Sequence, residues 1–432
     1  METTRVPEER GAPSARAPAR RWRHTGGVSL HGITITLAGA ERARAGHPQL
    51  PLSDLESPAA IEPGRPLRYA TAKGEAVGVG AADPENELLR VWRIPGDTGI
   101  EVRALDAAFF RRHVRRALAL RQTLGLADGE SAYRLVNGEG DGLSGLAADI
   151  YGSFAVVTAL SRGLLGHARV LGEAVMAVLT EAGLPVRGAV LKARLKAQGA
   201  GPEKVKDQVI GEEPPAKLVV QERGVPYEVH LRGGINVGLF SDMRDHRAGL
   251  GRFVRGARVL NTFAYTGALS LAAARAGAAA VTSVDLAAGP LAWARENFRL
   301  SGLDPGAAAY RWEVSDVFRF LEVERARGAR YDAIILDPPT VSGARAGSWA
   351  QKRDYPELIA AACALLPDEG GHLWVSSNTH RGPGILKHVE AGMALGGRTV
   401  DVLELGGLPP DYPTPASWPA ARYLEVCQLR VA

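Results

Sequence analysis

The chain has 432 residues, of which 46% are hydrophobic and 23% charged, with a formal net charge of +5 and a pI near 9.2. This length and composition predict a soluble globular protein of two or three domains. No apolar run approaches the roughly 20 residues that span a bilayer, and no signal-peptide core follows Met1. The only two cysteines, Cys363 and Cys427, exclude a disulfide framework and a cysteine-based zinc site, so we expect a cytoplasmic protein.

The amino-terminal third predicts a tail and a small β-rich domain. Residues 1–26 are rich in Arg, Pro and Ala and lack apolar periodicity, which is typical of a disordered basic tail. Residues 27–104 hold short strand-like runs separated by Gly and Pro clusters. These runs cover residues 32–37, 67–70, 76–79 and 88–92.

Residues 105–230 mix strand and helix patterns and predict a central α+β domain. Strands are expected near residues 133–143 and 155–158, a helix over 168–180, and a mobile loop from Lys192 to Lys217. Asp106 is placed to cap a helix that runs to about Gln122. This helix carries one basic surface, which is either a solvated face or an RNA contact, and its arginines are Arg111, Arg112, Arg115, Arg116 and Arg121.

Residues 231–432 alternate strands and helices, which predicts an α/β domain with a mostly parallel, Rossmann-like sheet. The parallel strands are expected at residues 258–262, 280–285, 310–314, 331–336 and 371–376. A final antiparallel hairpin at the sheet edge is expected from residues 399–405 and 423–429.

The segment YDAIILDPPT, residues 331–340, reads as a buried strand that stops at an acid and two prolines. Prolines cannot continue a strand ladder, so the chain must leave the sheet there as a rigid loop. Open α/β sheets bind ligands at the carboxyl ends of their strands. Asp337, Pro338 and Pro339 are therefore the candidate catalytic loop.

Other strand ends carry the residues of a nucleoside site. The first strand runs into Phe263, Ala264, Tyr265, Thr266 and Gly267, and the glycine lets a ligand approach the backbone at a helix start. Acids then end or follow the next strands, and they are Asp285, Asp316 and Asp337.

The turn has a single glycine and lacks the G-x-G-x-x-G motif that binds the pyrophosphate of a dinucleotide, so a nicotinamide dinucleotide is disfavoured. A nucleoside with an amino-acid tail, S-adenosylmethionine (SAM), fits better. Asp285 would hold its ribose and Asp316 its adenine amino group.

The chain resembles the class I methyltransferases of large-subunit (23S) ribosomal RNA. The likeness lies in LNTFAYTG (260–267), DPPT (337–340), AAFFRR (107–112), residues 133–146 and GLFSDMRDHR (238–247). It implies a SAM-dependent enzyme that acts on rRNA. The β-rich start resembles the family's PUA domain, an RNA-binding module, although Gln49 follows His47-Pro48 where the family commonly has Trp.

The resemblance implies two chemistries. The 5-methylcytosine branch needs a cysteine nucleophile after the fifth strand, and here Ser377 stands at that position. The 7-methylguanine branch is closer at DPPT, at KRD (352–354) and at residues 376–381. Guanine N7 has a free lone pair, so positioning alone could supply most of the rate. Methylation of an exocyclic nitrogen remains open.

Thr340 replaces the aromatic residue that stacks on the base in amino-methylating enzymes. The candidates for stacking elsewhere are Tyr265, Phe240, Tyr355 and Trp349. The candidate phosphate contacts outside the basic helix are Arg244, Arg247, Arg353 and Arg381.

Three alternatives to an rRNA-modifying enzyme stay open. They are a small-molecule or protein methyltransferase, an NAD-dependent oxidoreductase, and a non-catalytic RNA-binding assembly factor.

Overall fold

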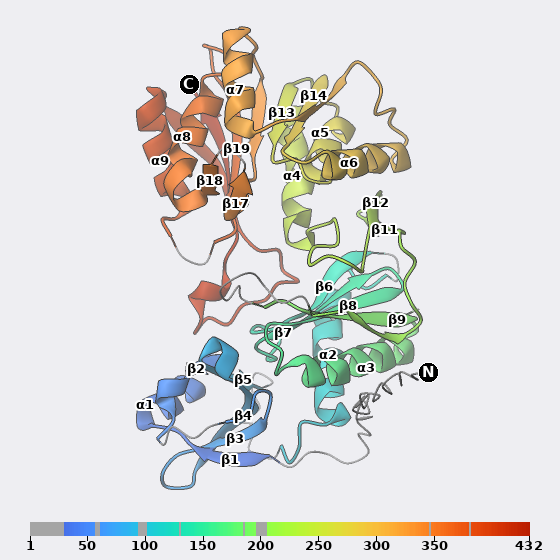
Figure 1. Ribbon diagram of the computed structural model, residues 1–432, viewed down its shortest axis with the longest axis vertical. Coiled ribbons are helices and arrows are strands. Elements are labelled where there is room, and N and C mark those ends of the chain that lie inside the picture. The colour runs from blue at the N-terminus through green and yellow to red at the C-terminus, as the bar shows by residue number, and fades with distance from the viewer. Residues whose placement is uncertain are drawn as a thin grey trace, which may run out of the picture.

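The computed structural model describes residues 30–56, 61–93, 102–128, 131–184, 186–195, 205–344, 347–379 and 382–432. The expected tail (1–26) and Arg381 lie outside these residues. The molecule is elongated, with the amino-terminal sheet at one end and the carboxyl-terminal sheet at the other (Figure 1). A middle sheet, drawn in cyan and green, lies between them.

The amino-terminal sheet has five strands in the order β1-β3-β4-β5-β2. Its elements are β1 (His31–Thr34), α1 (Leu37–Arg44), β2 (Gln49–Pro51), β3 (Pro66–Ala70), β4 (Ala76–Asp83) and β5 (Leu88–Trp92). The expected strand over 32–37 is wrong in its second half, because the Thr36 hydroxyl accepts from Gly39 N (3.1 Å) and caps α1. Gln49 lies in β2, which the sequence did not predict, and its side-chain oxygen accepts from Arg90 (2.9 Å).

The middle sheet has the order β10-β9-β8-β7-β6, and a small β11-β12 ladder follows it. Its elements are α2 (Ala107–Thr123), β6 (Ala132–Asn137), β7 (Leu146–Tyr151), β8 (Phe154–Ala159), α3 (Leu165–Glu181), β9 (Gly188–Ala193), β10 (Gln208–Gly211), β11 (Leu218–Glu222) and β12 (Val225–Val229). Asp106 caps α2 as expected, accepting from Phe109 N (2.9 Å). The expected loop from Lys192 to Lys217 is wrong at β10, which pairs antiparallel with β9.

The carboxyl-terminal sheet has seven strands in the order β15-β14-β13-β16-β19-β21-β20. Its elements are α4 (Arg244–Val254), β13 (Arg258–Thr262), α5 (Ala268–Arg275), β14 (Ala280–Asp285), α6 (Ala288–Leu300), β15 (Tyr310–Val314), α7 (Val317–Ala326), β16 (Ala333–Leu336), α8 (Gln351–Cys363), β19 (Gly371–Ser377), α9 (Ile385–Gly396), β20 (Val400–Gly406) and β21 (Glu425–Val431). The first five strands run parallel and β21 and β20 pair antiparallel at one edge, as predicted. A small β17 (Val341–Ala344) and β18 (Gly347–Ala350) hairpin follows the prolines.

Helices cover both faces of this sheet, which explains the continuous apolar run in β16. Ala333 and Ile335 pack with α4 and α5 on one face. Ile334 and Leu336 pack with α7, α8 and α9 on the other. A strand buried on both faces must be apolar at every position, since successive side chains point to opposite faces.

The connection between β20 and β21, residues 407–424, is long and runs from the carboxyl-terminal domain toward the other two (Figure 1). In the middle domain, the Asn137 amide donates to the Pro413 carbonyl (2.8 Å). In the amino-terminal domain, the Gly46 carbonyl accepts from the Ser417 hydroxyl (2.8 Å). This one connection therefore contacts all three domains.

Candidate active site at the carboxyl edge of the parallel sheet

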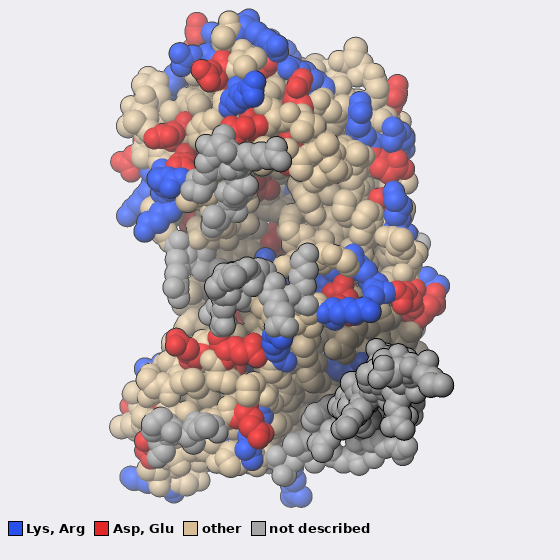
Figure 2. All heavy atoms as spheres, in the orientation of Figure 1, with Lys and Arg blue, Asp and Glu red and all other residues tan. Residues whose placement is uncertain are grey.

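The carboxyl ends of four neighbouring strands lie level with one another. Thr262 at the end of β13 is in register with Val284 of β14 and with Leu336 of β16, and Leu336 is in register with Val375 of β19. The residues that follow these strands therefore meet along one sheet edge, where ligands bind in this fold class. Figure 2 shows a hollow below the carboxyl-terminal domain in which Asp or Glu atoms are visible.

The loop after β13 has an unusual backbone. Phe263, Tyr265 and Gly267 all have positive φ angles (56°, 48° and 73°). The first two are strained because L-residues with side chains rarely adopt this region, and such strain is held only where the surroundings fix it. A Cβ on Gly267 would lie 2.6 Å from the Cβ of Ala294, so only glycine fits there.

Asp285 and Thr266 fix this loop. One Asp285 carboxylate oxygen accepts from Tyr265 N (2.9 Å) and the other from Ala287 N (3.0 Å). The Thr266 hydroxyl donates to the Gly238 carbonyl (2.5 Å). The carboxylate is thus oriented at the strand end, and its remaining lone pairs suit the two hydroxyls of a ribose.

Asp316 has a structural role whether or not a ligand is bound. Its carboxylate accepts from Arg319 N (3.1 Å) and caps α7. The residue is half-buried and lies two positions after the end of β15. The expected contact with an adenine amino group stays a prediction.

Asp337 is bound by a residue that sequence reasoning did not single out. The Ser376 hydroxyl, from the neighbouring strand β19, donates to the Asp337 carboxylate. The pKa of Asp337 is raised to about 6, mainly by burial and also by the charge of Asp242, while the Ser376 hydrogen bond and the charge of Arg247 partly oppose this rise. A carboxyl with such a pKa at the ligand edge of a sheet is a functional-site signature.

The prolines after Asp337 are held in place. Pro338 is buried, and the Pro339 carbonyl accepts from the indole N–H of Trp349 (2.7 Å). Trp349 is only 8% exposed, so its packing role excludes it as a free stacking surface.

Tyr355 is also wrong as a stacking candidate, because its side chain is fully buried. Its hydroxyl donates to the Ser376 carbonyl (2.7 Å) and accepts from Ser376 N–H (3.2 Å). The chain leaves the sheet at Pro338, and the pairing of β16 with β19 ends at Leu336 and Val375. The Tyr355 hydroxyl bonds the backbone N–H and carbonyl of the next residue, Ser376, and so positions it.

Two of the expected phosphate contacts are wrong. The Arg244 side chain is 3% exposed and bonds both carboxylate oxygens of Asp411 (2.6 and 3.1 Å). The Arg247 side chain is 4% exposed and binds Glu222 (2.5 and 2.7 Å). A buried guanidinium needs a partner carboxylate, and these pairs provide it.

The other expected RNA contacts divide by exposure. Arg111, Arg112 and Arg115 are exposed on α2, and Arg353 is exposed at the start of α8. Arg121, expected on the same basic surface, is instead buried in a pair with Asp141 (2.8 Å). The basic surface of α2 is therefore narrower than the sequence suggested.

Two further residues of the segment 238–247 reach the site. Asp242 is half-buried, accepts from the Tyr423 hydroxyl (2.7 Å) and raises the pKa of Asp337. Phe240 is 44% exposed, with its ring 5.6 Å from that of Tyr265. Sequence reasoning named Phe240 as a candidate but had no signal for Asp242 beyond the family likeness of this segment.

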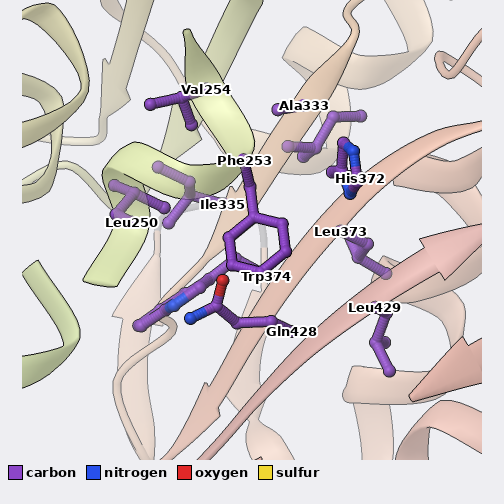
Figure 3. A pocket seen from close by; sticks show the side chains of 11 residues that line it. Leu250, Phe253, Val254, Ala333, Ile335, His372, Leu373, Trp374, Gln428 and Leu429 are labelled. Atoms are coloured by element: carbon purple, nitrogen blue, oxygen red, sulfur yellow. The ribbon is translucent and has the colours of Figure 1, made fainter. Parts of the chain in front are cut away.

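A separate pocket lies on the α4 face of the sheet (Figure 3). It is lined by Leu250, Phe253, Val254, Ala333, Ile334, Ile335, His372, Leu373, Trp374, Gln428 and Leu429. Three of these residues come from α4 and the others from β16, β19 and β21 short of the carboxyl edge at Asp337, and none is acidic. This pocket is therefore not part of the site around Asp337.

Comparison with known proteins decides the family. Residues 165–424 match the family of S-adenosylmethionine-dependent methyltransferases. The chain belongs to this family. The methyltransferase fold and the SAM cofactor expected from the sequence are thereby confirmed. The fixed loop 263–267 and the oriented Asp285 carboxylate fit that cofactor.

Curated relatives match over most of their length. The chain is 31% identical to "Ribosomal RNA large subunit methyltransferase I" of Klebsiella pneumoniae, over 85% of this chain and 90% of that protein. It is 33% identical to the protein of the same name from Salmonella arizonae, over 85% of this chain and 89% of that protein.

Two solved structures share the architecture. One is a methyltransferase complexed with SAH, with a TM-score of 0.79, 25% identity, and coverage of 93% of this chain and 100% of that chain. The other is a SAM-dependent methyltransferase from Streptococcus mutans, with a TM-score of 0.77 and the same identity and coverage. Within the part of the chain that the structure describes, no helix is long and apolar enough to cross a membrane.

Proposed function

We propose that the protein is a cytoplasmic enzyme that methylates a base nitrogen of large-subunit rRNA, with guanine N7 as the favoured atom. One observation carries the choice of nitrogen. The Asp337-Pro338-Pro339 loop lies beside the serines Ser376 and Ser377, and no cysteine accompanies it. The names of the curated relatives support rRNA as the substrate.

Carbon-5 methylation of a pyrimidine needs a thiolate, and neither cysteine suits that role. Cys363 and Cys427 are 1% and 0% exposed. Burial raises the pKa of each thiol to about 12, so the thiolate is scarce at neutral pH. Ser377 is also buried, with its hydroxyl 3.4 Å from the Gln351 side-chain oxygen to which it donates.

Nitrogen methylation requires less of the protein. The SAM sulfonium supplies an activated methyl group. At guanine N7 the ring lone pair forms the new N–CH₃ bond, the S–CH₃ bond breaks and its electron pair returns to sulfur. No proton has to leave, so the protein's task is to align the two atoms.

Asp337 has two uses in this arrangement. Its carboxylate is placed to accept from an amino group on the base edge, which orients the ring. The positive charge that arrives on the base is stabilised by a carboxylate at short range in a partly buried site. The raised pKa of Asp337 means that both effects weaken as the pH falls toward about 6.

We propose that the RNA contacts all three domains. Exposed Arg111, Arg112 and Arg115 on α2 and Arg353 on α8 support these contacts, because arginines that contact phosphates supply most of the sequence-independent affinity. The PUA-like character of residues 27–104 and the contact at Arg381 belong to the same proposal.

Nucleoside mass spectrometry of rRNA tests the proposal. We expect one methylated purine, 7-methylguanosine, to be absent when the gene is deleted and restored by the wild-type gene. A Cys363→Ala/Cys427→Ala variant should restore it, and Asp337→Asn should not. Loss of 5-methylcytidine on deletion would refute the nitrogen assignment. An rRNA unchanged by deletion, with methyl transfer found only in a metabolite or protein panel, would refute the rRNA assignment.

A further inference from the structure

Among the residues that the structure describes, Phe240 is the only Phe, Tyr or Trp whose side chain is exposed and not buried or half-buried. It is 44% exposed, while its neighbours Leu239 and Ser241 are each only 3% exposed. An exposed aromatic ring between two buried residues gains little from packing. Since the other described Phe, Tyr and Trp side chains are buried or half-buried, this ring is the candidate for an aromatic contact with a ligand.

The backbone around Phe240 is held firmly, although its side chain is exposed. The Phe240 carbonyl accepts from the buried guanidinium of Arg247 (2.8 Å), which is itself paired with Glu222. The next residue, Ser241, shares a hydrogen bond with the Tyr412 hydroxyl (2.7 Å). A rigid support of this kind keeps the ring in one place and lowers the entropy lost when a ligand binds.

The Phe240 ring lies next to the cofactor loop, and charged residues of the same segment act on Asp337. It is 5.6 Å from the ring of Tyr265, whose loop fits the cofactor. Two residues along, Asp242 acts electrostatically on Asp337, the proposed base-binding carboxylate. A flat ligand resting on Phe240 would thus lie beside the cofactor loop.

We propose that Phe240 is the platform on which the target base stacks after it has left the RNA helix. The inference rests on the proposed function, since it presupposes a nucleic-acid base as substrate. A planar heteroaromatic ring gains from a parallel aromatic face, and that gain does not depend on which base is present. Phe240 therefore holds the base plane, and Asp337 reads its edge.

Substitutions of Phe240 separate stacking from simple apolar contact. Phe240→Ala and Phe240→Leu should each lower kcat/KM for rRNA by about tenfold to a hundredfold, the range expected for one base–aromatic stack. Phe240→Tyr keeps the ring and should retain most of the activity. Leu395→Ala is the matched control, because Leu395 is 64% exposed in the same domain, on α9, and should change nothing.

SAM binding, measured by titration, must be the same in all four variants and the wild type. A weakened SAM affinity in Phe240→Ala would overturn the inference, because the ring would then touch the cofactor. Wild-type activity in Phe240→Leu would also overturn it, because any apolar side chain would then suffice.

A binding assay keeps this test separate from the proposed function. Wild type and Leu395→Ala should quench the fluorescence of 2-aminopurine in a single-stranded RNA, and Phe240→Ala should not. If the wild type methylates no rRNA, the proposed function fails, yet the quenching still tests stacking. Equal quenching by Phe240→Ala and wild type would overturn the stacking role even if rRNA is methylated.

Discussion

Replacing Ser376 by Ala tests whether the ionised form of Asp337 is the active one. The Ser376 hydroxyl donates to the Asp337 carboxylate and lowers its pKa, while burial raises it, and the net pKa is about 6. A hydrogen bond to a charged group contributes about 1.5–3 kcal/mol, which corresponds to about one to two in pKa. The Ser376→Ala variant should therefore have its Asp337 pKa at about 7–8.

The effect on rate follows from the ionised fraction. At pH 7 the wild-type carboxylate is about 90% ionised, and the variant carboxylate would be about 10–50% ionised. Methyl transfer to rRNA at pH 7 should fall about twofold to ninefold, and it should return to near the wild-type value at about pH 9. The assay is kcat/KM from about pH 5 to pH 9 with saturating SAM.

The raised pKa of Asp337 also makes the free energy of unfolding depend on pH. The folded pKa of Asp337 lies above its unfolded value, so the native state binds more protons between about pH 4 and 6. Its contribution to the free energy of unfolding therefore falls as the pH rises through that window, and Ser376→Ala should extend the window upward.

The kcat/KM profile also contains the result that would refute this reasoning. If Ser376→Ala lowers kcat/KM by the same factor at every pH and its activity declines at the same acidic pH as the wild type, Ser376 acts on the geometry of the site and not on the pKa of Asp337.

Three other substitutions test the site and the buried ion pair next to it. Asp337→Asn should reduce methyl transfer by at least a hundredfold while SAM binding, followed by titration, persists; full activity in this variant would contradict the catalytic-loop assignment. Gly267→Ala should weaken SAM binding and lower the melting temperature, because its Cβ would meet Ala294 at 2.6 Å and its φ is 73°; an unchanged SAM affinity would show that the loop does not hold the cofactor. Asp411→Asn should cost about 3–5 kcal/mol of unfolding free energy in denaturant titrations, because it removes the charge that binds buried Arg244 through two hydrogen bonds and leaves only Asp245, 3.5 Å away. The control, Asp401→Asn, removes a pair whose side chains are each 62% exposed and should cost far less.

The parallel sheet was predictable because burial on both faces leaves a direct trace in the sequence. Every residue of β16 from Ala333 to Leu336 is apolar, and the following prolines mark where the strand must end. Helix α1 was missed because its Gly, Ala and Arg content shows little periodicity and its cap, Thr36, also favours strands. Strand β10 was missed because its partner β9 lies across a polar segment.

The acids of the site were predictable and several arginines were not, for one physical reason. An acid at the end of a strand is located by the strand itself, as Asp285 and Asp337 were. An arginine is located by its partner, and Arg244 finds Asp411 at a distance of 167 residues along the chain. Sequence shows the charge of such a residue but not whether a carboxylate already neutralises it, so Arg244 and Arg247 read as phosphate contacts.

The buried arginines have a consequence for how the site is held together. The Asp411 carboxylate accepts from Arg244 in the catalytic domain and from the backbone N–H of Arg134 in the middle domain (3.1 Å). Desolvation cancels much of what such pairs add to stability, but they are satisfied in one geometry only. Arg244 lies two residues from Asp242 and four from Phe240. The same contacts that join the domains therefore also fix the segment that carries Phe240 and Asp242.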